Sequence, residues 1–170
     1  MVAALHGPPG QQFELQTQAL YLDGPELRTT RTLLNWGWRP GDLHVPNFSP
    51  TDFLAIQETA AREFDGHLNV YHQTSSKFLE DAAAPPWAAA IRQKHGGHGP
   101  YSLVYMDYTN VNQWARDVEL LCKERLFVPG AVFAVTCPAR APHVSASEVR
   151  TLTSRLISLA GVKWLCLRNY

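Results

Sequence analysis

Short apolar runs alternate with segments of helical periodicity along most of this chain. The runs end at Gly, Pro, Asp or Asn, as buried strands do, and the segments between them repeat apolar residues at the spacing of one helix face. We expect strands at residues 19–22, 42–45, 68–71, 101–106, 131–135 and 163–167, and helices at 26–36, 50–63, 76–79, 87–93, 111–126 and 147–159. This alternation predicts an α/β fold: a doubly wound, mostly parallel sheet of about six strands with helices on both faces.

The connections between these elements also predict how the strands are ordered in the sheet. Right-handed crossovers favour the order third, second, first, fourth, fifth, with the sixth strand beyond the fifth. Residues 1–18, which contain Gly7-Pro8-Pro9-Gly10 and several Gln, predict a flexible lead-in. Residues 19–170 are then a single domain.

Composition places the chain among globular proteins. Of 170 residues, 45% are hydrophobic, and 15 Lys and Arg balance 15 Asp and Glu. A net charge of zero argues against broad electrostatic binding of nucleic acid, which needs a basic surface. No apolar run reaches the roughly 18 residues of a membrane span, and the start of the chain lacks the signal-peptide pattern. Together with three scattered cysteines, these features predict a cytoplasmic protein without membrane contact.

The expected strand tips carry the strongest functional signal. In open parallel sheets, ligands bind outside the carboxyl ends of the strands, at the point where the strand order reverses. The tips read Asp23-Gly24-Pro25-Glu26, Pro46-Asn47-Phe48, His72-Gln73-Thr74-Ser75, Asp107-Tyr108-Thr109-Asn110 and Thr136-Cys137-Pro138-Ala139-Arg140. Most of these tips are rich in hydrogen-bonding groups, whereas the strands that precede them are apolar, which indicates a polar crevice on an apolar base.

Each polar tip also has a purely structural interpretation. Asp, Thr, Asn and Ser cap helices well, so the tips of the first, third and fourth strands equally fit turns and helix caps. His95 and His98 lack obvious further ligands, so no metal site is predicted. No acid or His is tied to Cys137 by a motif, which favours a buried thiol over a nucleophile.

Three common phosphate or nucleophile motifs are missing from the sequence. It contains no GxGxxG, no GxSxG and no GxxxxGK[ST] pattern. These absences disfavour a dinucleotide-binding loop, an α/β-hydrolase and a P-loop NTPase.

From residue 19 to 170, the pattern of strand tips resembles the class I S-adenosylmethionine-dependent methyltransferases, which have a Rossmann-like fold. Leu20-Tyr21-Leu22-Asp23-Gly24-Pro25 matches the turn that holds the methionine end of the cofactor. Asn47 stands where an acid for the ribose hydroxyls is usual, and Gln73-Thr74-Ser75 stands beside the adenine position. Asp107-Tyr108-Thr109-Asn110 resembles the polar–aromatic motif that faces the methyl group.

The resemblance implies S-adenosylmethionine as cofactor and a methyl acceptor that the sequence does not identify. Its cofactor-binding residues would be Asp23, Gly24, Pro25, Asn47, Gln73, Thr74 and Ser75. Asp107 or Tyr108 would orient or deprotonate the acceptor. Nucleic acid is a weakly supported acceptor: Arg28, Arg31, Arg39 and Arg140 would contact phosphate, although scattered surface charges explain them better.

The sequence departs from this family in three ways. One glycine, Gly24, remains of the glycine-rich loop, the ribose-binding acid is missing, and we expect the usual closing hairpin to be incomplete or absent. The alternative is therefore a non-catalytic binding or assembly module, with its pocket filled by Trp36, Trp38, Phe48 or Trp87. In that case the strand edge at residues 164–167 would pair with a second copy. A third hypothesis is a hydrolase or lyase that uses His72 and Asp107 as a base and acid pair.

Two geometric expectations follow for the acids. Asp23 and Asp107 end strands that should be adjacent, so we expect them in one pocket. Pro25 stiffens the turn after the first strand, so we expect the Asp23 carboxylate to point into the crevice rather than back to the helix.

Overall fold

A parallel sheet forms the centre of the computed structural model, which describes residues 18–85, 89–90, 93, 99–107, 111–136 and 154. Its strands are β1 (Gln18–Tyr21), β2 (Leu43–Pro46), β3 (Asn69–Tyr71), β4 (Tyr101–Asp107) and β5 (Phe127–Thr136). They lie in the order β3-β2-β1-β4-β5, and every neighbouring pair is parallel. The expected order of the first five strands is confirmed; the sixth, at 163–167, lies outside the described residues.

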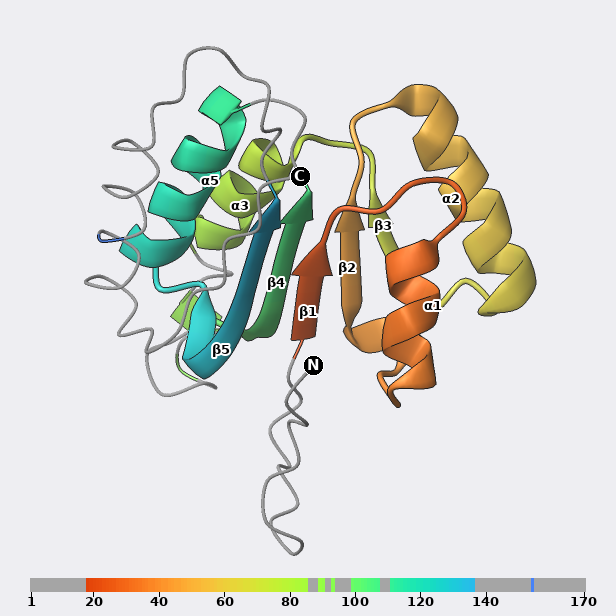
Figure 1. Cartoon of the computed structure of the whole chain (residues 1–170), viewed down its shortest axis with the longest axis horizontal. Coiled ribbons are helices and arrows are strands. Elements are labelled where there is room, and N and C mark those ends of the chain that lie inside the picture. Colours follow the sequence, from red (N-terminus) through yellow and green to blue (C-terminus); the bar gives the residue numbers. More distant parts are fainter. Residues whose placement is uncertain are drawn as a thin grey trace, which may run out of the picture.

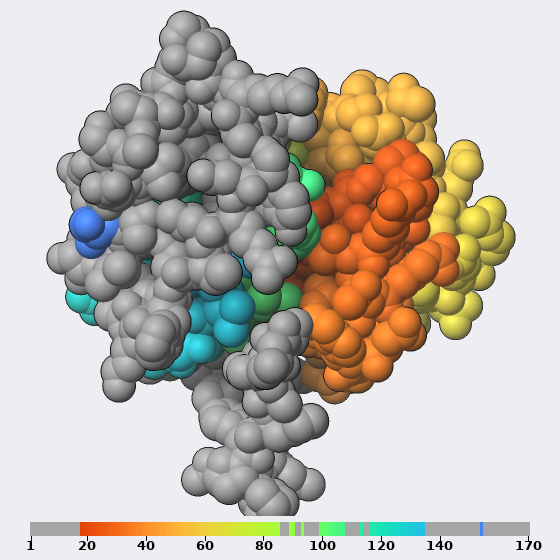
Figure 2. Space-filling view, viewed as in Figure 1, coloured from red at the N-terminus to blue at the C-terminus, as the bar shows by residue number. Residues whose placement is uncertain are grey.

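Helices cover both faces of this sheet, as the alternation predicted (Figure 1). They are α1 (Arg28–Asn35), α2 (Pro50–Glu63), α3 (Ser75–Ala83) and α5 (Val111–Lys123), with a short 3-10 turn at Pro40–Asp42. The helix expected at 147–159 and most of that at 87–93 lie outside the described residues. Figure 1 places α1 and α2 on one side of the sheet and α3 and α5 on the other. Figure 2 shows the segment after β1 at the molecular surface, with α1 and α2 beside it.

Two apolar clusters, one on each face, bind these layers together. Successive residues of β1 point to opposite faces, so Leu20 joins one cluster while Ala19 and Tyr21 join the other. The first cluster also contains Phe78, Leu79, Val104, Met106, Val118 and Leu121, and the second contains Leu33, Leu43, Val45, Ile56 and Ala60. These side chains come both from the strands and from the helices that cover them. Their packing therefore holds each helix at a fixed position relative to the strand tips.

Local boundaries follow from caps and from left-handed residues. The hydroxyl oxygen of Ser49 accepts from the amide of Asp52 at 3.3 Å, and Pro50 occupies the first turn, so α2 begins as expected. Helix α1 was expected from residue 26 but begins at Arg28, because Leu27 has a φ of 52° and cannot belong to a right-handed helix.

Two further boundaries differ from the expectation. Helix α3 extends from Ser75 to Ala83 and is longer than expected. Strand β5 was expected at 131–135 but begins at Phe127, and it contains an irregularity where Gly130 has a φ of 82°. The register jumps from Tyr101↔Phe127 to Leu103↔Val132, so extra residues of β5 bulge out of the ladder.

One histidine is part of the core. His44 in β2 is buried, and its Nδ1 lies 2.9 Å from the hydroxyl of Tyr71. Its ring lies edge-on to Tyr101, with centroids 5.7 Å apart. Burial lowers the pKa of His44 to about 4, so the imidazole is neutral at physiological pH. Among the described residues, no helix is long and apolar enough to cross a bilayer.

Candidate functional site

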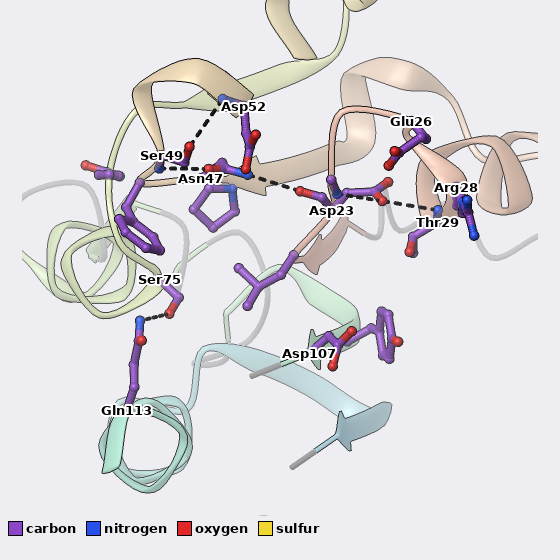
Figure 3. Close-up of a pocket in the computed structure, with 16 residues that line it drawn as sticks. Asp23, Glu26, Arg28, Thr29, Asn47, Ser49, Asp52, Ser75, Asp107 and Gln113 are labelled. Carbon is purple, nitrogen blue, oxygen red and sulfur yellow. Dashed lines mark hydrogen bonds between the residues drawn. The ribbon is translucent and has the colours of Figure 1, made fainter. Parts of the chain in front are cut away.

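A cavity of about 590 Å³ opens at the carboxyl ends of β1, β2 and β4 (Figure 3). This is the point where the strand order reverses, with β2 on one side of β1 and β4 on the other. Its lining comes from the tips of these strands and from the helix starts beside them. The lining residues are Leu22, Asp23, Gly24, Glu26, Arg28, Thr29, Pro46, Asn47, Phe48, Ser49, Asp52, Gln73, Ser75, Tyr105, Asp107 and Gln113.

The Asp23 carboxylate turns back to the start of α1. One oxygen accepts from the amides of Gly24 at 3.1 Å and Thr29 at 3.4 Å, and the other accepts from the amide and hydroxyl of Thr30 at 2.8 and 2.9 Å. The expectation that this carboxylate points into the crevice is therefore wrong. The physical reason lies at Leu27, which precedes α1 in a left-handed conformation and supplies no side-chain cap. The first amides of the helix need an acceptor, and Asp23 provides it.

A buried tyrosine extends this network into the core. The hydroxyl of Tyr21 lies 2.9 Å from the hydroxyl oxygen of Thr30. Since the Thr30 hydroxyl donates to Asp23, its oxygen accepts from Tyr21, and the three side chains form a chain of hydrogen bonds. Burial raises the pKa of Tyr21 well above its ordinary value, so the phenol stays protonated and remains the donor. The tip of β1 is thus fastened to the start of α1.

Asn47 joins the tips of β1 and β2. Its side-chain nitrogen donates to the carbonyl oxygen of Asp23 at 3.1 Å, and its side-chain oxygen accepts from the amide of Ser49 at 2.9 Å. One amide hydrogen and one lone pair stay outside these two bonds. Asn47 therefore aligns the two tips and still offers a donor and an acceptor to a ligand.

Two further acids line the cavity, and neither was among the site residues expected from the sequence. Asp52 lies in the first turn of α2. Glu26 lies in the turn after β1, and its carboxylate is close to Gly24: a Cβ atom added to Gly24 would be 3.3 Å from Oε2 of Glu26. The signal for Asp52 was present in the sequence. A helix that follows a parallel strand starts at the strand's carboxyl end, so its first-turn side chains face the same crevice.

A buried acid outside the cavity holds the start of α3 beside helix α5. The carboxylate of Asp117 in α5 is fully buried and accepts from the hydroxyls of Ser75 and Ser76 at the start of α3. Gln113, one helical turn earlier in α5, donates to the Ser75 hydroxyl oxygen at 3.0 Å. Since Ser75 and Gln113 both line the cavity, these bonds hold two of its walls together.

The structure brings together most of the residues expected at the cofactor. Asp23, Gly24, Asn47, Gln73 and Ser75 all line the cavity. Asp107 lines it too, so the two acids share one pocket as expected (Figure 3).

The other expected site residues lie elsewhere. Pro25 and Thr74 are not among the lining residues, and Thr74 caps α3 by accepting from the amide of Lys77 at 3.2 Å. Tyr108 lies outside the described residues. His72 stacks on Phe53, with ring centroids 4.8 Å apart, and does not line the cavity with Asp107.

Two of the arginines considered for phosphate binding form surface ion pairs. Arg31 pairs with Glu63 at 2.6 Å and Arg39 with Asp42 at 2.8 Å, whereas Arg28 lines the cavity. Arg140 lies outside the described residues, as do the strand edge at 164–167, Cys137, His95 and His98. No group of three or more potential metal ligands occurs in the described part of the chain.

Of the aromatic residues considered as pocket fillers, the three that the structure describes do not fill the cavity. Phe48 stands at its rim with 68% of its surface exposed, and Trp36 and Trp38 are not among the lining residues. Trp87 lies outside the described ranges. The side chains that the structure describes therefore leave space for a ligand.

Solved structures with the same fold include methyltransferases. The chain is similar to a protein from Haemophilus influenzae assigned as a methylase, with 15% identity, a TM-score of 0.54, and coverage of 79% of this chain and 76% of that one. It is also similar to a protein from Galdieria sulphuraria assigned as a sarcosine dimethylglycine methyltransferase, with 14% identity, a TM-score of 0.52, and coverage of 85% of this chain and 48% of that one. The chain matches no family model and no curated protein sequence. Strand order, layers and these likenesses together show that the chain has the Rossmann-like fold of the class I methyltransferases, in a divergent form.

Proposed function

We propose that this protein is an S-adenosylmethionine-dependent methyltransferase whose cofactor binds in the cavity at the tips of β1, β2 and β4. One observation carries the proposal: the cavity is open, has a volume of about 590 Å³, and collects polar groups from three strand tips at the switch point of the sheet. Small-molecule sites commonly measure about 300–1,000 Å³ and occur at this place in α/β sheets.

The side chains of the cavity fit the cofactor if Glu26, and not Asp23 as expected from the sequence, binds its methionine end. A carboxylate offers about four lone-pair sites, and the Asp23 carboxylate already accepts four hydrogen bonds from the protein. Asp23 is then a positioning residue that holds the β1 turn in place. The Glu26 carboxylate, beside Gly24, would accept from the ammonium of the methionine end.

The tip of β2 supplies partners for the rest of the cofactor. Asp52 and the remaining donor and acceptor of Asn47 would hydrogen-bond the ribose hydroxyls. Asp52 thereby takes the place of the acid that is missing at the end of the second strand. Phe48 at the rim offers a flat apolar surface for the adenine ring, and Gln73 offers an amide for its polar edge.

The chemistry itself requires little from the protein. S-adenosylmethionine supplies a methyl group on a positively charged sulfur, so the acceptor gains a bond to carbon, the carbon–sulfur bond breaks, and a neutral thioether leaves. The protein orients the acceptor and accepts the proton that it releases. Asp107 at the end of β4 lines the cavity and would accept this proton, and Tyr108, the next residue in the sequence, would orient the acceptor.

A non-catalytic binding module is the second candidate, and a specific observation favours it. The acid that should contact the cofactor, Asp23, is fully used by the start of α1. A protein that no longer bound the cofactor would keep this structural role of Asp23. Cofactor binding therefore separates the two candidates.

The experiment measures cofactor binding directly. S-adenosylmethionine and S-adenosylhomocysteine are titrated into the full chain, followed by calorimetry and by the melting temperature, which must rise with ln(1 + [ligand]/Kd). Asp52→Asn should weaken binding of both ligands by about tenfold, the value of one charge-assisted hydrogen bond. Glu58→Gln, an exposed acid of α2 outside the cavity, is the matched control and should change neither affinity. No stabilisation at millimolar ligand would reject the proposal and favour the module.

A further inference from the structure

The cavity carries a local charge that the chain as a whole lacks. The formal net charge of the protein is zero, yet the residues that line the cavity include four acids and one arginine, which gives this described lining a formal net charge of −3. The acids are Glu26, Asp52, Asp107 and Asp23, whose carboxylate turns to the start of α1, and the arginine is Arg28. Figure 3 shows that Asp52, Glu26 and Asp107 approach from different sides. The acidic residues therefore lie on more than one side of the cavity.

Some acids of this chain form an ion pair, whereas two of those in the cavity have no such partner among the described residues. Glu63, Glu80 and Asp81 each form an ion pair with Arg or Lys. Neither Glu26 nor Asp52 forms an ion pair within the described ranges of the chain. Clefts lined by one sign of charge focus the field and raise the local concentration of ligands of the opposite charge.

The cavity also has an aromatic lining that suits a bound cation. Tyr105 of β4 lines the same cavity, two residues before Asp107, and is separate from Phe48, which would contact the adenine ring. The face of an aromatic ring attracts ammonium groups, most strongly where water is excluded. The same cavity thus contains acids and an aromatic residue, two kinds of protein group that recognise a positively charged nitrogen.

We propose that the methyl acceptor is an amine that reaches the cavity as an ammonium cation. This inference rests on the proposed function and adds the acceptor's chemical class. The bound cofactor contributes one net positive charge, which leaves the described lining of the site negative. That remaining charge attracts a second cation and repels phosphate, so the acidic cavity disfavours nucleic acid as acceptor.

An ammonium group is a better precursor of a nucleophile than a guanidinium group, the other common biological cation. It loses one proton at a lower cost than a guanidinium does, and the neutral nitrogen then has a free lone pair. That proton passes to the Asp107 carboxylate and on to water. The nitrogen lone pair forms the new bond to the methyl carbon, the carbon–sulfur bond breaks, and its electron pair stays on sulfur as the neutral thioether. The positive charge ends on the methylated nitrogen, so charge and atoms balance.

The experiment uses the full chain saturated with S-adenosylhomocysteine, which cannot transfer a methyl group. Two ammonium probes are titrated by calorimetry: cadaverine, a free amine, and a short peptide with one lysine between neutral residues. The same peptide with its lysine acetylated and a short single-stranded oligonucleotide are the comparison ligands. If S-adenosylhomocysteine does not bind, the proposed function has failed, and the same titrations on the chain alone still test the cavity's preference for ammonium.

We expect at least one ammonium probe to bind about tenfold more tightly than the acetylated peptide and the oligonucleotide. Stronger binding of cadaverine would assign a small amine as acceptor, and stronger binding of the peptide would assign a lysine side chain. Asp107→Asn should weaken the ammonium probe about three- to tenfold while leaving S-adenosylhomocysteine affinity unchanged, whereas Glu58→Gln should change neither. Equal affinity for the acetylated peptide, or tighter binding of the oligonucleotide, would overturn the inference.

Discussion

The substitution Asp23→Asn tests whether the acid at the β1 tip acts on the fold or on the ligand. Its carboxylate accepts four hydrogen bonds, and two of them, from the amide and hydroxyl of Thr30, are short at 2.8 and 2.9 Å. An Asn in the same position keeps one acceptor oxygen, which can serve Thr30, and turns its NH₂ group toward the amides of Gly24 and Thr29. Those two hydrogen bonds are lost, together with the charge that strengthens the others.

The cost follows from these contacts. Losing a helix cap costs about 0.5–2 kcal/mol, and removing the negative charge from a helix N-terminus costs about 0.3–1 kcal/mol more. We expect Asp23→Asn to lower the free energy of unfolding by about 1–2 kcal/mol, which is a fall of several degrees in melting temperature for a chain of this size. Asp23→Ala, which removes every acceptor, should cost about 2–4 kcal/mol.

Urea unfolding of the unliganded protein measures this loss, and calorimetry with S-adenosylhomocysteine measures the affinity of the same variant. Glu26→Gln is the control, because this exposed side chain forms no ion pair within the described residues and should leave stability unchanged. A double-mutant cycle with Thr30→Val should show a coupling energy of about 0.5–3 kcal/mol, as for residues in one network. Unchanged stability with a large loss of affinity would refute the reasoning and return Asp23 to direct contact with the ligand.

Three further predictions concern the interior. Burial lowers the pKa of His44 to about 4, below the value of about 6.5 in the unfolded chain, so stability that is complete above pH 6.5 should decline as the pH falls toward 4. The loss should reach at most about 3 kcal/mol, and His44→Phe should flatten this part of the pH–stability curve in urea unfolding. Asp117→Ala leaves the buried hydroxyl of Ser75 and the half-buried hydroxyl of Ser76 without this acceptor and should cost about 2–4 kcal/mol, against no measurable change for the exposed Glu119→Ala. Gly99→Ala should lower the melting temperature by several degrees, because the added methyl group would lie 2.3 Å from backbone atoms of Leu126.

The sequence predicts the strand order because that order depends on features that are visible in one dimension. Apolar runs, helix periodicity and the handedness of crossovers need no knowledge of side-chain direction. The cap of α2 is equally local, since Ser49 and Pro50 adjoin the helix that they start. The start of α2 was therefore predicted correctly, whereas the starts of α1 and β5 differ from the expectation.

The direction of Asp23 could not be predicted in this way. It depends on the left-handed backbone of Leu27, a residue type that rarely adopts that conformation. Pro25 does stiffen the turn, but stiffness does not set its direction, and the open amides of Thr29 and Thr30 decide where the carboxylate goes. Asp52 was missed although its position is predictable: the first turn of a helix that follows a parallel strand lies at the carboxyl end of that strand, beside the tips that line the cavity.

The hydrogen-bond chain through Tyr21, Thr30 and Asp23, with the Asn47 bridge beside it, has a consequence for how a ligand arrives. This side of the cavity is already assembled before binding, so a ligand pays no entropy to order it and association here resembles docking against a rigid surface. A rigid side of the cavity also limits the size of ligand that can bind, because residues held to the core cannot move aside for a bulkier analogue. Discrimination among similar ligands should therefore be strict on the β1–β2 side of the cavity.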